Sequence, residues 1–112
     1  MTIRKKSHPA LVLALAVSAL APAASGQDAG RDQAAIEAGE AVYNNYCQTC
    51  HGDRLVSTGQ TFDLRRLTAG DRARFENSVR NGKNQMPPWK GVLSDEQIDQ
   101  VWRYIRANAY QK

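Results

Sequence analysis

The residues with the clearest chemistry lie at five consecutive positions, Cys47-Gln48-Thr49-Cys50-His51. In the pattern C-x-x-C-H the two thiols attach a haem covalently, each through a thioether to one vinyl group of the porphyrin. The histidine directly after the second cysteine then lies under the iron and binds it. The sequence therefore predicts one haem c, attached through Cys47 and Cys50, with His51 as an iron ligand.

The second iron ligand is predicted from a count. Residues 27–112 contain one histidine, His51, and one methionine, Met86. No other histidine is present there for a second imidazole ligand, so the natural ligand on the opposite face of the iron is the Met86 thioether. Gly82 and Pro87-Pro88 flank Met86, which indicates a stiff loop rather than a helix. A histidine and a methionine on the iron favour electron transfer.

Other interpretations of these residues stay open. A C-x-x-C pair occurs in thioredoxin-like redox proteins, although the βαβ pattern around such pairs is absent here. A structural zinc ion needs four cysteine or histidine ligands, and residues 27–112 offer three. A disulfide between Cys47 and Cys50 closes a very small loop and adds little stability. Met86 is alternatively a core side chain beside an iron that is open on one face.

The first residues have the parts of a secretory signal peptide. Basic residues 4–6 precede an apolar run at 10–21, and small residues follow at 22–26. The run is shorter than the about 20 residues of a membrane-spanning helix, which favours cleavage over an uncleaved anchor. We expect a signal peptide at 1–26, cut between Ala24 and Gln27. The mature domain, 27–112, is expected in the periplasm without stable membrane insertion.

Export also explains most of the basic character of the chain. The full sequence has 15 Lys and Arg against 11 Asp and Glu. Removing residues 4–6 leaves 12 basic and 11 acidic side chains. No basic run with interleaved aromatic residues remains, which excludes nucleic-acid binding. A domain of this size commonly needs a source of stability besides its own hydrophobic core, and a covalent haem provides one.

The hydrophobic pattern predicts an all-α fold. Residues 34–43 have apolar side chains at spacings of three and four, which indicates a helix leading to Cys47. Residues 27–32 are small and polar and predict a loose leader. The irregular stretch 52–67 predicts a loop around one haem edge. No segment alternates as a strand does.

Two more helices follow from their end signals. Thr68-Ala69-Gly70-Asp71 is typical of a helix cap, and Asn81-Gly82 of a helix end. Ser94-Asp95-Glu96-Gln97 is a capping box that opens the last helix. Its predicted buried side chains are Ile98, Val101, Trp102 and Ile105, with Tyr104 beside them.

Together these motifs resemble the class I monohaem cytochromes c over nearly all of 27–112. The matching elements are Gly39 and Tyr43, Cys47-x-x-Cys50-His51-Gly52, Val79-Arg80-Asn81-Gly82 before Met86-Pro87, and Leu93-Ser94-Asp95-Glu96 before Tyr104-Ile105. The resemblance implies the cytochrome c fold, three main helices and loops wrapped around one covalent haem. It also implies haem attachment at Cys47 and Cys50 and His51/Met86 ligation of the iron.

The resemblance carries two further implications. Gly39 and Tyr43 are expected to pack against Val101 and Tyr104 of the last helix. Members of the family often have Gly-Pro shortly after the haem motif, and a carbonyl there accepts the Nδ1–H of the histidine. Residues 53–59 contain no proline, so the acceptor for His51 is not identified. For Trp89, packing on the haem edge, an N–H to a propionate and plain core packing all stay open.

The predicted function is that of a soluble, monomeric, one-electron carrier of the periplasm. Its expected donor is a periplasmic dehydrogenase, such as a quinoprotein (PQQ-dependent) enzyme, and its acceptor a terminal oxidase or another cytochrome. The alternatives are an open-iron haem protein, acting as a peroxidase-like enzyme or gas sensor, and a permanent cytochrome subunit of one dehydrogenase. Lys83, Lys90 and Arg54 form either a docking patch or ordinary solvated charges.

Overall fold

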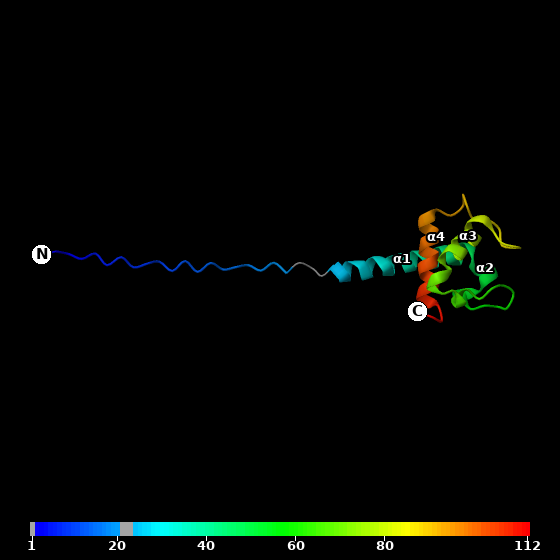
Figure 1. The fold of residues 1–112 in the computed structure, drawn as a ribbon, viewed down its shortest axis with the longest axis horizontal. Coiled ribbons are helices and arrows are strands. Elements are labelled where there is room, and N and C mark those ends of the chain that lie inside the picture. The colour runs from blue at the N-terminus through cyan, green and yellow to red at the C-terminus, as the bar shows by residue number, and fades with distance from the viewer. Residues whose placement is uncertain (1, 21–23) are drawn as a thin grey trace.

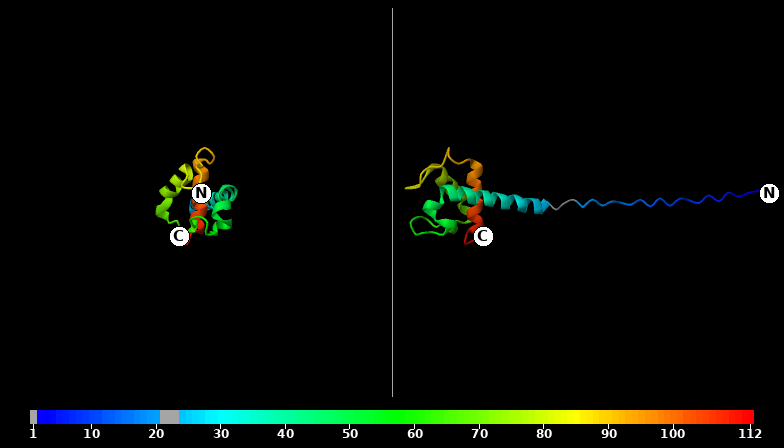
Figure 2. Two further views of the ribbon diagram at one scale, coloured as in Figure 1. Left: turned by 90° about the vertical axis from the view of Figure 1, so that its right-hand side faces the viewer. Right: turned by 180° about the vertical axis from the view of Figure 1, so that it is seen from behind.

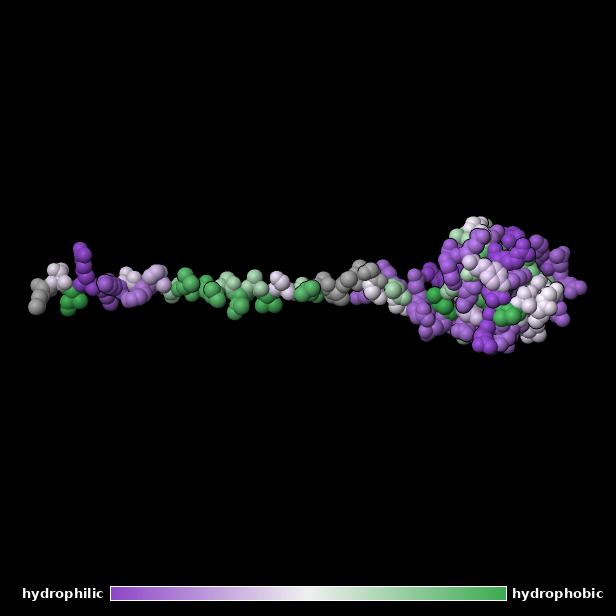
Figure 3. All heavy atoms as spheres, turned by 90° about the horizontal axis from the view of Figure 1, so that it is seen from below, coloured by the Kyte–Doolittle hydropathy of each residue, from purple (hydrophilic) through white to green (hydrophobic). Residues whose placement is uncertain are grey.

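The computed structural model describes residues 2–20 and 24–112, and within these ranges it contains α-helices and short 3₁₀ turns but no strand. Figure 1 shows the helices gathered into one body, except for the first turns of the first helix, which project from it toward the extended residues 2–20. The apolar side chains of that segment are exposed along it (Figure 3). The signal peptide stays a prediction, and Pro22 and Ala23 of the expected cleavage region lie outside the described residues.

The described part of the chain includes no helix with the length and apolar character needed to cross a membrane.

Helix α1 (Ala24–Tyr46) is longer than its hydrophobic pattern indicates. The prediction of a loose leader at 27–32 is wrong, because these residues form the first turns of this helix. Their side chains are exposed, so burial gives them no apolar periodicity. Polar contacts support the extra turns: Arg31 pairs with Asp28 on α1, and Asp32 pairs with Arg103 on α4 (Asp95–Asn108).

Helices α1 and α4 cross at close range (Figure 2). Gly39 lies at the crossing, where a Cβ atom would be 1.9 Å from the Gln100 carbonyl oxygen and 3.0 Å from the Val101 backbone nitrogen. One turn later the Tyr43 ring packs on Tyr104, with ring centroids 5.4 Å apart. The expected packing of Gly39 and Tyr43 on the last helix is therefore confirmed.

The core lies between α1, α4 and α3 (Arg72–Asn81). From α3, Phe75 and Val79 are buried, and the Phe75 ring packs on Trp102 at 5.2 Å between centroids. All five apolar or aromatic positions expected on the inner side of the last helix are buried, namely Ile98, Val101, Trp102, Tyr104 and Ile105. The all-α prediction is confirmed.

Both predicted helix starts are present with their polar caps. The Asp71 carboxylate accepts the backbone N–H of Thr68 at 2.8 Å and closes the 3₁₀ turn η3 (Ala69–Asp71) that leads into α3. At α4, Ser94 and Gln97 exchange hydrogen bonds of 2.9 and 3.1 Å. Arg72 then joins the two helices through Asp99, at 2.6 Å.

Replacing Gly39 with alanine tests the helix crossing. The new Cβ would collide with backbone atoms of α4, which cannot rotate away, so we expect Gly39→Ala to lower the free energy of unfolding by at least about 2 kcal/mol. Gly30→Ala is the matched control, because the same helix has open space at Gly30 and alanine should add up to about 1 kcal/mol. Urea denaturation of the haem-loaded proteins measures both. Equal stabilities for the two variants would contradict the close crossing.

Candidate haem site

One helical turn arranges the cysteines and the histidine. Cys47 follows α1 directly, and α2 (Gln48–His51) begins at the next residue. The Cys47 carbonyl accepts the backbone N–H groups of Cys50 and His51, at 3.2 and 3.0 Å. Residues four apart in a helix share a face, so Cys47 and His51 both line the same cavity while Cys50 is exposed beside it. Both thiols are free.

Gly52 ends this turn and anchors it to the core. Its φ of +95° is a left-handed conformation, and a Cβ would lie 1.9 Å from the Val56 carbonyl oxygen. The Gly52 carbonyl accepts a buried hydrogen bond of 2.6 Å from the Tyr43 hydroxyl. Burial and the neighbouring Cys47 thiol, together with other nearby groups, raise the pKa of Tyr43 far above its ordinary value. The phenol thus stays protonated and donates, which ties the end of the motif to α1.

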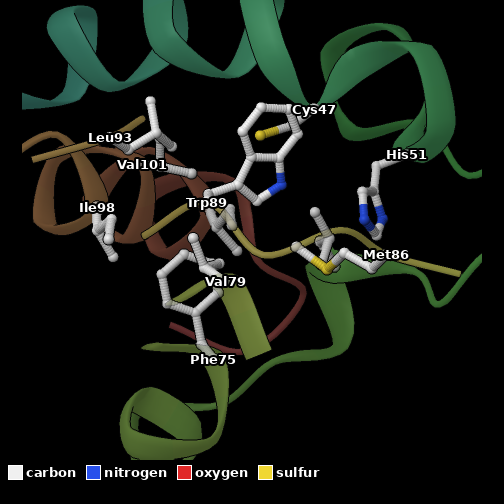
Figure 4. A pocket seen from close by; sticks show the side chains of 11 residues that line it. Cys47, His51, Phe75, Val79, Met86, Trp89, Leu93, Ile98 and Val101 are labelled. Atoms are coloured by element: carbon white, nitrogen blue, oxygen red, sulfur yellow. The ribbon is translucent and has the colours of Figure 1, made fainter. Parts of the chain in front are cut away.

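The cavity beside this motif is almost entirely apolar (Figure 4). Besides Cys47, His51 and Met86, its walls are apolar or aromatic, namely Leu64, Phe75, Val79, Trp89, Leu93, Ile98, Val101 and Ile105. Such walls suit a large apolar ring rather than a charged ligand. Apart from the Cys47 thiol, which the haem motif uses for covalent attachment, the groups here that bind iron well are one imidazole and one thioether, so the residues present fit a haem.

The Met86 side chain reaches the cavity from a tightly bonded loop. Lys83 and Met86 exchange two backbone hydrogen bonds of 3.0 Å each. Farther on, the backbone N–H of Trp89 donates to the Val79 carbonyl at 2.8 Å, and this bond fastens the loop to α3. Gly82 has a φ of +76°, and a Cβ there would lie 2.7 Å from the Met86 carbonyl oxygen. In Figure 4 the Met86 and His51 side chains lie at the same end of the cavity.

The acceptors for the His51 ring lie in the loop after the motif. The Nδ1 atom is 3.4 Å from the Phe62 carbonyl oxygen and 3.2 Å from the Thr61 hydroxyl oxygen. A carbonyl can only accept, so Nδ1 carries the proton and Nε2 keeps its lone pair for a metal. Burial lowers the pKa of His51 below its ordinary value, although the Phe62 carbonyl acts in the opposite direction. The imidazole is therefore neutral at pH 7.

Sequence reasoning did not identify Thr61 and Phe62. The loop between the motif and Leu64 has no regular repeat and lacks the familiar Gly-Pro, so no pattern marked where the chain returns to the histidine. The signal that was available is weak: a hydroxyl and an aromatic residue just before the 3₁₀ turn η2 (Leu64–Arg66).

The environment of Cys47 keeps its thiol protonated. Burial and the neighbouring Cys50 raise the pKa of Cys47 to about 11. The thiolate is the form that attacks disulfides and reacts with oxidants, so it is scarce at pH 7. A redox-active C-x-x-C pair needs the opposite, a lowered thiol pKa. The thioredoxin-like interpretation therefore lacks its chemical basis here.

The sequence also singled out Trp89 and three basic residues, Lys83, Lys90 and Arg54. Trp89 lines the cavity, and its ring meets that of Tyr46 edge-on, with centroids 5.5 Å apart. Lys83 and Lys90 are exposed on either side of Met86, and neither takes part in an ion pair within the described ranges. Arg54 pairs with Asp53 at 3.4 Å. The residues that the structure describes include no group of three or more His, Cys, Asp or Glu able to hold a metal ion.

Known proteins match much of this chain. Residues 34–105 match the family described as cytochrome C oxidase, cbb3-type, subunit III. Cytochrome c6 of Euglena gracilis is 36% identical over 78 residues, which cover 63% of this chain and 90% of that protein. Cytochrome c6 of Leptolyngbya boryana is 38% identical over 73 residues, covering 61% and 86%.

A larger relative matches only in part. The quinohemoprotein alcohol dehydrogenase ADH-IIG of Pseudomonas putida is 37% identical over 81 residues, which cover 70% of this chain and 11% of that protein. Its solved structure superposes with a TM-score of 0.66, covering 70% of this chain and 12% of that one. The chain thus spans about a tenth of the length of this relative.

Proposed function

The chain belongs to the cytochrome c family, and we propose that it carries single electrons between redox proteins. Members of this family bind haem c covalently, and this chain binds one. We assign its thioether bonds to Cys47 and Cys50 and its iron ligands to His51 and Met86. One observation carries this proposal: Cys47, His51 and Met86 line a single cavity whose other walls are apolar or aromatic.

The residues around the cavity account for a carrier rather than a catalyst. Haem iron supplies the chemistry, since it gains or loses one electron. His51 and Met86 would both hold the iron, which would leave it no free position for a substrate. The apolar walls keep water away, so little solvent reorganises when the charge changes. The two backbone hydrogen bonds between Lys83 and Met86 fix the loop from which the thioether would reach the iron.

The alternative of an open iron, in a peroxidase-like enzyme or a gas sensor, requires that Met86 leave the metal free. The bonded loop argues against this, because its contacts with Lys83 and its close fit on Gly82 hold the Met86 backbone at a place from which the side chain lines the cavity beside His51.

Met86→Ala separates the two possibilities. The wild-type oxidised protein should show the weak red absorption band of an iron–methionine bond and should bind carbon monoxide slowly and incompletely when reduced. Met86→Ala should lose that band completely and bind carbon monoxide fast. Gln85→Ala, the exposed neighbour on the same loop, should behave as wild type. Rapid, complete carbon monoxide binding by the wild type at neutral pH would overturn the carrier assignment.

We further propose that the electron donor is a periplasmic quinoprotein (PQQ-dependent) dehydrogenase, with a terminal oxidase or another cytochrome as acceptor. The support is the match to part of a quinohemoprotein alcohol dehydrogenase, in which a segment like this chain belongs to the same polypeptide as the enzyme. The same match supports a variant of this proposal, a permanent subunit of one dehydrogenase.

A purified quinoprotein alcohol dehydrogenase tests the donor. In the presence of its alcohol, a catalytic amount of enzyme should reduce the haem of this protein fully, and without alcohol it should reduce none. Repeating the measurement at rising ionic strength with Lys83→Gln and Lys90→Gln shows whether these lysines guide docking, because steering between exposed charges weakens with salt. Absence of alcohol-dependent reduction would contradict this donor. A stoichiometric complex that survives gel filtration would favour the permanent subunit.

We also propose that the protein acts in the periplasm as a monomer after cleavage of residues 1–26. The basic, apolar and small-residue parts of the N-terminus support this, as does haem attachment, which takes place outside the cytoplasm. The intact mass of the haem-loaded protein from periplasmic extract should place its first residue between Ala24 and Gln27. A mass that retains residues 4–21 would contradict cleavage.

A further inference from the structure

We propose that Thr61 is a positioning residue for His51. Its hydroxyl shares the Nδ1 proton of His51 with the Phe62 carbonyl, and in this way it adjusts how strongly the imidazole donates to the iron. This inference rests on the proposed ligation by His51. It assigns a role to a side chain that lies outside the haem motif and has no part in binding the iron itself.

The direction of each hydrogen bond follows from a count of protons. The Thr61 hydroxyl has one proton, which it donates to the Cys50 carbonyl at 3.0 Å. Its 3.2 Å contact with His51 Nδ1 must then be one in which the hydroxyl oxygen accepts. The Phe62 carbonyl, 3.4 Å from the same nitrogen, also accepts. Both contacts therefore require the same tautomer, with the proton on Nδ1.

The Thr61 hydroxyl and the Phe62 carbonyl lie at different distances from His51 Nδ1. At 3.4 Å the carbonyl lies beyond the usual range of 2.7–3.2 Å for such hydrogen bonds, whereas the hydroxyl lies at its outer limit. Neither holds the proton strongly alone. Removal of the hydroxyl would leave His51 with one long contact, the one to the Phe62 carbonyl.

The loop that brings Thr61 to the histidine is fixed from outside. The exposed Phe62 ring lies beneath two guanidinium groups, Arg74 at 5.5 Å and Arg66 at 5.9 Å from its centroid. Directly afterwards, the Asp63 carboxylate accepts the Arg65 backbone N–H at 3.0 Å. Leu64 then returns to line the cavity. Thr61 is thus held against the turn that carries Cys50 and His51.

The consequence for the iron is electronic. An acceptor at Nδ1–H makes the imidazole a more basic ligand, and a more basic ligand favours oxidised iron. Loss of the Thr61 hydroxyl should therefore raise the reduction potential of the haem. The Phe62 acceptor is a backbone carbonyl, so a substitution at Phe62 does not remove it. The Thr61 acceptor is a side-chain hydroxyl, and a substitution at Thr61 does remove it.

The test compares three threonine variants of the haem-loaded protein. Thr61→Val keeps the shape but removes the hydroxyl, and its reduction potential should shift upward. Thr61→Ser keeps the hydroxyl and should retain the wild-type potential. Thr58→Val is the control for the same exchange at an exposed position of the same loop, and it should also leave the potential unchanged. Spectroelectrochemical titration measures all of them.

A second measurement does not depend on any variant. In NMR spectra of the reduced wild-type protein, the His51 Nδ1 proton should exchange slowly with water and show cross-peaks to Thr61. In Thr61→Val its exchange should become faster. A purely structural role of the Cys50 contact would lower stability in Thr61→Val but leave both the potential and the exchange rate at their wild-type values.

The outcomes separate this inference from the proposed function. Wild type without the iron–methionine band and without a slowly exchanging Nδ1 proton would overturn the proposed ligation itself. Normal wild-type spectra with an unshifted potential in Thr61→Val would overturn only the role of Thr61. If Thr61→Val does not load haem, the test is the wild-type cross-peaks between the His51 Nδ1 proton and Thr61. Absence of these cross-peaks would overturn the role of Thr61.

Discussion

The close crossing of α1 and α4 is the contact on which the site depends. Because Gly39 lets the two backbones meet, α1 arrives at the cavity at a fixed angle, and the turn that carries Cys47 and His51 follows it without a flexible linker. The Tyr43 hydroxyl then holds the far end of this turn through Gly52. This crossing turns Cys47 and His51 toward the side chains of α4. Without it, the two residues would not line the same cavity as α4.

The two proposed iron ligands come from segments that the fold fixes in different ways. His51 belongs to a helical turn, so its backbone is held by local hydrogen bonds, and its ring is oriented by the separate loop at Thr61 and Phe62. Met86 belongs to an irregular loop, where glycine, proline and backbone contacts to Lys83 and Val79 replace helical order. Between them lies an apolar cavity with no carboxylate or amine on its walls. A neutral imidazole and a thioether suit that environment, since neither brings a charge into it.

Features that depend on local sequence were predictable, and features that depend on the path of a loop were not. The shared face of Cys47 and His51 follows from helical spacing, and the inner side of α4 follows from its apolar stripe. Met86 was found because residues 27–112 offer no second methionine. The first turns of α1 were missed because exposed residues such as Arg31 need no apolar periodicity to be helical. Thr61 was missed because its contact with His51 spans ten residues of irregular chain, and no spacing rule places such a side chain.

Binding of the iron by both His51 and Met86 is what would make the protein a carrier. Proton NMR of the reduced, haem-loaded protein tests it most directly. A methyl group bound to iron through sulfur lies over the centre of the porphyrin, where the ring current shifts its resonance far upfield. The Met86 methyl group should give such a resonance. A Met86 methyl resonance at the ordinary position of a methionine would show that Met86 does not bind the iron.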